Sequence, residues 1–188
     1  LFIYDLIIYA YLIKDEIKIN QDQILDYLKL FKENIDITGN KKRLITYYLY
    51  RGLYYYKLDS KNDKTFPNYL EALEIVRENF GKRHPLYNSV YVYIIKYLFN
   101  EGNYLLTLDY VQKAFENLSH GFKSDGSYDN PEPTSFNDYD PVFIHLSYKI
   151  QSLLNLYKED DNIKFLLLAK QNADYILYLT EKLKWKYN

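Results

Sequence analysis

Apolar residues recur every three or four positions along most of this chain, which is the period of an amphipathic α-helix. One such stripe consists of Tyr91, Ile94, Ile95 and Leu98. Pro85 precedes it at a first helical position, where a missing N–H costs nothing, and Gly102 follows it where a left-handed C-cap is expected. The next stripe consists of Leu105, Leu108, Val111 and Phe115. Together they predict a helix, a tight turn and a second helix.

The same period continues through the rest of the chain and predicts an all-α fold of eight helices. The helices are expected at about 1–18, 21–34, 42–58, 65–80, 85–98, 104–118, 141–158 and 163–184. They form four antiparallel pairs within a single domain, 1–188, at about 1–36, 41–80, 85–119 and 141–184. A pair of this size cannot bury both of its stripes alone, so each pair needs a neighbouring pair.

Local residue choices qualify this pattern in three places. Gly52 lies inside the third helix at a cost of about 1 kcal/mol relative to Ala, so we expect close helix packing to compensate. Thr65 is expected to cap the fourth helix, and His84 the fifth. Residues 120–140 are rich in Gly, Pro, Ser, Asp and Asn, which predicts a mobile surface loop. This loop is either an insertion without a role or a partner contact.

The helix–turn–helix at 85–118 also carries a recognisable order of small and aromatic residues. Gly102 in the turn is followed by Tyr104 at the start of the second helix and by Ala114 late in it. This order resembles a tetratricopeptide repeat, whose basic unit has about 34 residues. The preceding linker, Gly-Lys-Arg-His-Pro, and the 42 positions between Ala72 and Ala114 are similar to the longer repeat of the kinesin light chain type. The resemblance implies a right-handed solenoid of about four helix pairs.

In that family the first helix of each pair lines a concave face that takes a peptide or a partner helix. The resemblance therefore implies a partner-binding set made of Tyr50, Tyr54, Val92, Lys96, Gln151 and Asn155. Three further residues are expected close to that face: Arg51, Tyr93 and Tyr148. The alternative is that these positions are ordinary amphipathic helix surface. The function implied is a non-catalytic protein–protein interaction scaffold, a subunit or segment of a larger multi-subunit assembly in the cytoplasm.

A second resemblance implies a different role. Ala114-Phe115, followed by Ser119-His120-Gly121, is similar to the helical C-terminal arm of SET-and-MYND lysine methyltransferases, which is itself tetratricopeptide-like. Such an arm shapes a substrate cleft that is built elsewhere in the enzyme. A Cys-rich zinc region and a SET core preceding the chain would favour this alternative.

Composition narrows the chemistry further. The 188 residues contain no Cys, which excludes disulfides, thiolate zinc sites and Cys nucleophiles. They also carry a net charge of only −1 and contain only three His. No phosphate-binding Gly loop, nucleophile elbow or His-Glu-x-x-His spacing occurs. We therefore expect no enzyme activity, catalytic residue, metal or cofactor, and no nucleic-acid or membrane partner. The run Tyr54-Tyr55-Tyr56 beside Arg51 leaves open a minor alternative, stacking on single-stranded nucleic acid.

The first predicted helix is almost wholly apolar from Leu1 to Leu12, yet it is too short to span a bilayer. The chain lacks Met and begins at Leu1, so we interpret it as part of a longer protein. An end helix of a repeat array needs a polar outer face, which this helix lacks. We expect preceding residues or another subunit to cover Phe2, Ile3, Ile7 and Ile8.

Overall fold

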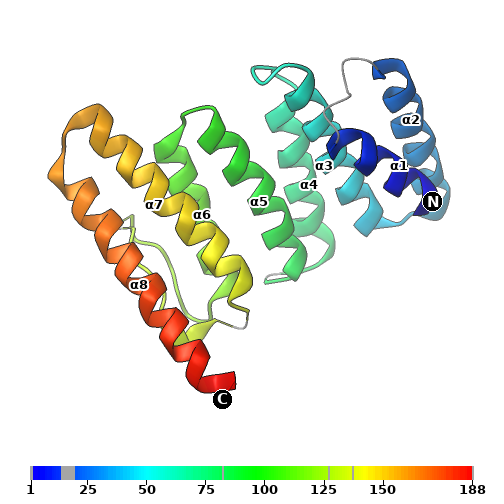
Figure 1. Ribbon diagram of the computed structural model, residues 1–188. Coiled ribbons are helices and arrows are strands. Elements are labelled where there is room, and N and C mark those ends of the chain that lie inside the picture. Colours follow the sequence, from blue (N-terminus) through cyan, green and yellow to red (C-terminus); the bar gives the residue numbers. More distant parts are fainter. Residues whose placement is uncertain (1, 14–19, 82, 127, 137, 188) are drawn as a thin grey trace. The chain divides into compact units, whose positions relative to one another are not determined.

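The protein is helical along most of the chain that its computed structural model describes. That part comprises residues 2–13, 20–81, 83–126, 128–136 and 138–187, without the side chains of Phe2 and residues 184–187. The α-helices are α1 (Phe2–Ile13), α2 (Gln21–Thr38), α3 (Lys41–Leu58), α4 (Thr65–Asn79), α5 (Pro85–Asn100), α6 (Tyr104–Leu118), α7 (Asp140–Asp160) and α8 (Ile163–Tyr187), with a short 3-10 helix, η1 (Pro133–Ser135) (Figure 1). Within those ranges the eight predicted helices are confirmed. The predicted end of the first helix, 14–18, lies outside them.

Several predicted helix boundaries are confirmed at the level of single residues. Pro85 is the first residue of α5, and Nδ1 of His84 accepts a hydrogen bond from the Leu86 N–H at 3.2 Å. Gly102 ends the same helix with φ +74°, a left-handed conformation that Gly adopts without strain. Thr65, in contrast, was wrongly predicted as a cap. It is the first residue of α4 and is buried, while Lys64 occupies the capping position.

The second helix extends a turn further than its pattern predicted. α2 continues to Thr38 because Ile35 follows Phe31 by four residues and joins the same buried face. Gly39 then stops the helix with φ +64°, and its N–H donates to the Ile35 carbonyl at 2.8 Å. The C-cap glycine therefore sets the end of this helix, four residues beyond the predicted end at 34.

The chain divides into two compact units, Leu1–Leu86 and Tyr87–Asn188, and each unit contains two of the predicted helix pairs. In the first unit, α1, α2 and α3 share one core. Its buried members are Ile8, Leu12, Ile24, Leu28, Phe31, Ile35 and Tyr54. Each fully buried aliphatic or aromatic side chain of this kind contributes about 1.5–3 kcal/mol. This core therefore fixes how α2 and α3 face each other.

Gly52 lets α4 pack closely on α3 within the first unit. A Cβ placed on Gly52 would lie 2.5 Å from Cε1 of the Tyr69 ring, inside van der Waals contact. The ring of Tyr69 is almost fully buried against this glycine. The predicted reason for a glycine inside this helix, close packing, is confirmed.

In the second unit, α7 packs against both α6 and α8, and the Tyr91 and Tyr110 rings join α5 to α6 with centroids 6.3 Å apart. The predicted stripe of α5 is buried in full. In α6 the inclusion of Leu105 was wrong, because its side chain is 54% exposed. The buried face of α6 instead begins at Thr107, a small residue whose hydroxyl donates to the Asn103 carbonyl at 2.9 Å.

The segment between α6 and α7 packs against the helices more closely than a mobile surface loop would. Ser119 and Phe136 form an antiparallel bridge, and both are buried. The Gln112 side chain donates to the Asp129 carbonyl at 3.0 Å, and the Tyr175 hydroxyl donates to the Pro131 carbonyl. Most described residues of 120–140 are exposed or half-buried, as predicted for a surface loop, but polar side chains from the helices bind its backbone.

Helix α1 has two different faces. Ile8 and Leu12 are fully buried in the core of the first unit. Ile3, Leu6 and Ile13 on the other face are each more than half exposed, with Ile3 at 67%. Of the four side chains expected to be covered, only Ile8 is buried by described residues, whereas Phe2 lies outside the description. No described helix combines the length and the apolar character needed to cross a membrane.

Candidate interaction groove between α2 and α3

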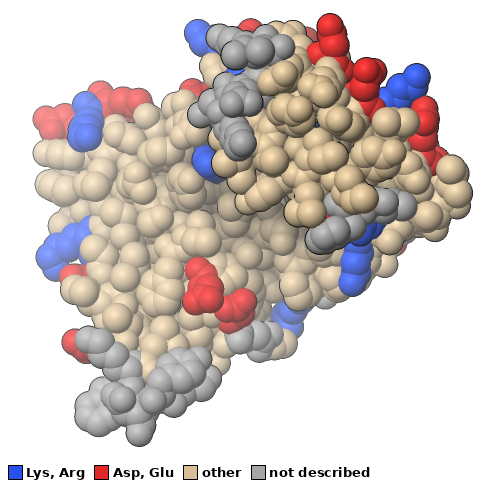
Figure 2. All heavy atoms as spheres, turned by 45° about the vertical axis from the view of Figure 1, so that its right-hand side comes forward, with Lys and Arg blue, Asp and Glu red and all other residues tan. Residues whose placement is uncertain are grey.

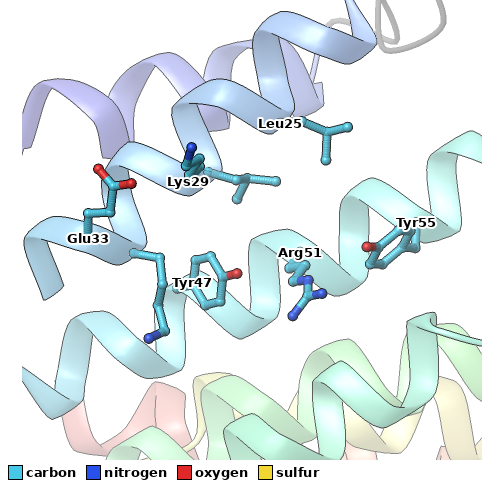
Figure 3. A pocket seen from close by; sticks show the side chains of 8 residues that line it. Leu25, Lys29, Glu33, Tyr47, Arg51 and Tyr55 are labelled. Atoms are coloured by element: carbon cyan, nitrogen blue, oxygen red, sulfur yellow. The ribbon is translucent and has the colours of Figure 1, made fainter. Parts of the chain in front are cut away.

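A groove with a volume of about 250 Å³ lies between α2 and α3 in the first unit. Figure 3 shows the side chains of both helices that line it. Its lining, referred to below as the α2–α3 groove, consists of Leu25, Leu28, Lys29, Lys32 and Glu33 from α2 and Tyr47, Arg51 and Tyr55 from α3. The volume corresponds to that of about eight water molecules in the liquid, so it suits one large side chain or a short segment of chain.

Helical spacing explains why α3 presents its three groove residues together. Tyr47, Arg51 and Tyr55 follow one another at intervals of four, so they lie along one face of the helix. The guanidinium carbon of Arg51 lies 5.8 Å from the centroid of the Tyr55 ring, within the range of a cation–π interaction. Nζ of Lys64 lies 5.4 Å from the same centroid. Two cations, Arg51 and Lys64, therefore lie against the Tyr55 ring of the α3 wall.

The α2 wall supplies an apolar floor and mixed charge. Leu28 is buried in the core beneath the groove, whereas Leu25 remains partly exposed at its rim. The Lys32 ammonium is already paired with Asp36, at 2.6 Å. This leaves Lys29 and Glu33 as the remaining charged groups on this wall.

Burial and hydrogen bonding set the protonation states on the α3 wall. Burial raises the pKa of Tyr47, although the Arg51 charge opposes that shift. Burial alone would lower the pKa of Arg51, but a hydrogen bond with the Tyr55 side chain and the neighbouring phenols raise it above its usual value. At neutral pH Tyr47 is therefore a neutral phenol and Arg51 a permanently charged guanidinium. Among the described residues, no carboxylate forms an ion pair with Arg51.

The arrangement is suited to binding rather than to bond-breaking. A phenol whose pKa is raised is a poor nucleophile, and an arginine does not exchange protons near neutral pH. Across the described ranges, no three His, Asp or Glu side chains are placed to hold a metal ion. On the face shown in Figure 2, Lys and Arg lie next to Asp and Glu in several places, among many uncharged residues. Recognition here therefore depends on local contacts and not on a long-range field.

Two of the residues expected to bind a partner lie on α3 but outside the groove. The prediction that Tyr54 is exposed for partner binding is wrong, because its side chain is only 2% exposed and belongs to the core of α1, α2 and α3. Tyr50 is half-buried, and its hydroxyl donates to Oδ1 of Asp5 in α1 at 2.8 Å. Both side chains hold the first unit together. Arg51, which was expected only close to the binding face, lies in the groove itself.

The remaining four predicted site residues belong to the second unit. Val92 and Asn155 are half-buried, while Lys96 and Gln151 are exposed. The Gln151 side-chain amide donates to the Ser147 carbonyl of its own helix at 3.2 Å. A shared binding face for these residues stays a prediction.

Sequence reasoning missed the α2 wall and both groove tyrosines. A signal for the α3 wall is present in the sequence, because Tyr47, Arg51 and Tyr55 repeat at intervals of four and so fall on one face of a helix. No comparable signal marks Leu25 and Lys29, which become groove residues only because α2 packs beside α3.

The second unit contains a different polar cluster, on the buried face of α7. The Lys149 ammonium is fully buried and donates to the Tyr128 carbonyl, to the Asp129 carbonyl at 3.3 Å and to Oδ1 of Asn130 at 2.8 Å. It also lies 5.5 Å from the centroid of the Phe115 ring. Burial lowers the pKa of Lys149 to about 7, and the Asp129 charge partly opposes this shift. Lys149 thus anchors 128–130 to α7.

His145, one turn before Lys149, is equally buried. Its Nε2 lies 2.6 Å from Oδ1 of Asn88 in α5, while Nδ1 has no hydrogen-bond partner in the described structure. Burial lowers the pKa of His145 to about 4, so the ring is neutral at physiological pH. Its hydrogen bond therefore joins α7 to α5 without bringing a charge into the core.

These features define an all-α protein whose helices pack against their neighbours and whose first unit carries an aromatic, cationic groove. No family model, curated protein or solved structure matches the chain. The fold and the groove geometry are therefore the observations on which a function can be argued.

Proposed function

We propose that this chain is a non-catalytic protein–protein interaction scaffold and that its first unit binds a segment of a partner protein in the α2–α3 groove. The observation that carries the proposal is the row Tyr47–Arg51–Tyr55 beside the apolar Leu25 and Leu28. Tyr and Arg are enriched among the residues that dominate interface energies, especially beside an apolar pocket. Both walls are helices fixed by a common core, so little conformational entropy is lost when a partner binds.

The wider proposal keeps the tetratricopeptide-like arrangement. The eight helices, the packing of α1 on α2, α3 on α4 and α7 on α8, and the close contact at Gly52 support a right-handed solenoid of about four pairs. In this proposal the chain is a segment of a larger cytoplasmic assembly. The predicted methyltransferase arm depends on Ala114, Phe115 and the residues after Leu118, and no feature of the groove favours it.

A peptide-display selection on the purified full chain tests the proposed function. Random peptides would be selected on the native chain and then tested for binding to Arg51→Ala and to a control, Lys170→Ala. Lys170 is exposed on α8, where it pairs with Asp174 at 2.8 Å, so its removal leaves the groove intact. We expect selected peptides to lose binding with Arg51→Ala only. Selected peptides that bind both variants equally, or a selection that enriches none, would contradict a role for the groove.

A further inference from the structure

The groove also contains information about the chemistry of the segment it binds. This inference rests on the proposed function and narrows it. We propose that the α2–α3 groove recognises an acidic side chain flanked by a large apolar side chain, in an otherwise unstructured segment of a partner protein. The carboxylate pairs with Arg51, and the apolar side chain packs on Leu25, Leu28 and Tyr55.

The first step of the argument is the state of Arg51. Its guanidinium is partly withdrawn from water, is held by Tyr55, and forms no ion pair with any described carboxylate. A guanidinium presents its N–H groups as a planar fork that matches a carboxylate in a bidentate geometry. Because Tyr55 already orients that fork, binding a carboxylate immobilises few additional rotamers. The unmatched cation is therefore complementary to an acidic group.

The second step is the order of the chemistry along the groove. Figure 3 shows Leu25 across from Tyr55 at one end, Arg51 in the middle and Glu33 toward the Tyr47 end. Lys29 and Glu33, of opposite charge, lie toward the Tyr47 end, whereas an acidic group in the middle meets Arg51. The apolar end lies on the side of Leu25 and Tyr55. The groove therefore favours a segment with its acidic residue central and its apolar residue toward Leu25.

The third step is size and partner class. About 250 Å³ accommodates one large side chain beside a carboxylate and is too small for a folded domain. An anionic lipid surface or a nucleic acid would need several cations over a wide area. Here the cations are confined to Arg51, Lys29 and the neighbouring Lys64, because Lys32 is paired with Asp36, and Glu33 adds a negative charge at the rim. The balance of charges thus favours a protein segment that carries one acidic group.

Two matched peptides test this inference on the full chain. One fluorescein-labelled peptide carries a Phe-Glu-Leu core and its twin carries Phe-Gln-Leu, so the pair differs only in charge. Charge-assisted hydrogen bonds contribute about 1.5–3 kcal/mol, so we expect the Glu peptide to bind about tenfold more tightly or better by fluorescence anisotropy. Raising the salt concentration should weaken only the Glu peptide.

Variants of opposite charge on the two walls provide the controls. Arg51→Gln should abolish the preference for the Glu peptide, and Arg51→Lys should recover only part of it, because an ammonium lacks the fork. Glu33→Gln should leave the preference unchanged or increase it. Circular dichroism would check that each variant keeps its helix content, as expected for side chains at the groove surface.

Each outcome separates this inference from the proposed function. Equal binding of the two peptides, no binding of either, or a charge preference that survives Arg51→Gln overturns the inference. Arg51-dependent binding of oligouridylate or of vesicles containing phosphatidylserine, tighter than that of the Glu peptide, also overturns it. If display selects Arg51-dependent peptides without an acidic residue, the scaffold function stands while this inference fails.

Discussion

The contact between Gly52 and Tyr69 predicts that a single methyl group will destabilise the first unit. On an exposed helix face, Gly→Ala stabilises by about 1 kcal/mol because Ala loses less backbone entropy. At Gly52 the new Cβ would lie 2.5 Å from Cε1 and 2.8 Å from Cδ1 of the Tyr69 ring. Atoms at these distances repel each other, so the ring or the helix has to move.

The surroundings of Tyr69 decide the magnitude of this effect. The ring is only 2% exposed, so it cannot swing into solvent without leaving the α3–α4 contact. Overpacking of a filled core costs about 1–3 kcal/mol. After the gain of about 1 kcal/mol from helix propensity, we expect Gly52→Ala to lower the free energy of unfolding by up to about 2 kcal/mol.

A double-mutant cycle measured by urea unfolding tests the assignment. Tyr69→Leu removes the ring atoms that the new methyl would meet, at its own cost in stability. In that background we expect Gly52→Ala to be neutral or to stabilise by up to about 1 kcal/mol, since only the propensity gain remains. If Gly52→Ala stabilises the native chain, or has the same effect in both backgrounds, the close packing assigned to these residues is refuted.

Three other predictions concern ionisation, burial and an exposed helix face. The folded chain releases the Lys149 proton near pH 7 and the unfolded chain near 10.5, so the free energy of unfolding should rise by about 2 kcal/mol from pH 7 to 9. Lys149→Met should lose this rise in denaturant titrations, and parallel curves for the two proteins would contradict the assignment. Leu108→Ala should lower the free energy of unfolding by about 2–5 kcal/mol and Leu105→Ala by much less, because only Leu108 is buried. Equal losses of stability in urea unfolding would contradict this assignment. If self-association covers the exposed face of α1, Ile3→Lys should shift the sedimentation of the isolated chain toward that of a monomer. A native chain that is already monomeric would exclude self-association through α1.

The helices and many of their ends were predictable because their signals are local. Hydrophobic periodicity, Pro85 at a first turn and Gly102 at a left-handed cap act within a few residues and need no distant partner. Even the reason for Gly52 was accessible, since a glycine inside a helix implies something close to it. The position of Thr65 was not, because its burial by other helices outweighed its local preference for a cap.

The choice of buried side chains required the tertiary structure. Tyrosines occupy several faces of α3, so periodicity alone could not distinguish the buried Tyr54 from the groove tyrosines Tyr47 and Tyr55. Hydrophobic periodicity could not predict that Lys149 is buried. Its burial is stabilised by three oxygen acceptors from residues 128–130, which only the fold brings to it.

For the groove, the sequence by itself determined one wall and the tertiary structure determined the site. The four-residue spacing places Tyr47, Arg51 and Tyr55 on one side of α3 whatever that helix packs against. Leu25 and Lys29 join them only because the shared core sets α2 beside α3. A helix face follows from periodicity within one segment, whereas a groove requires two segments whose relative position depends on side chains far apart in the chain.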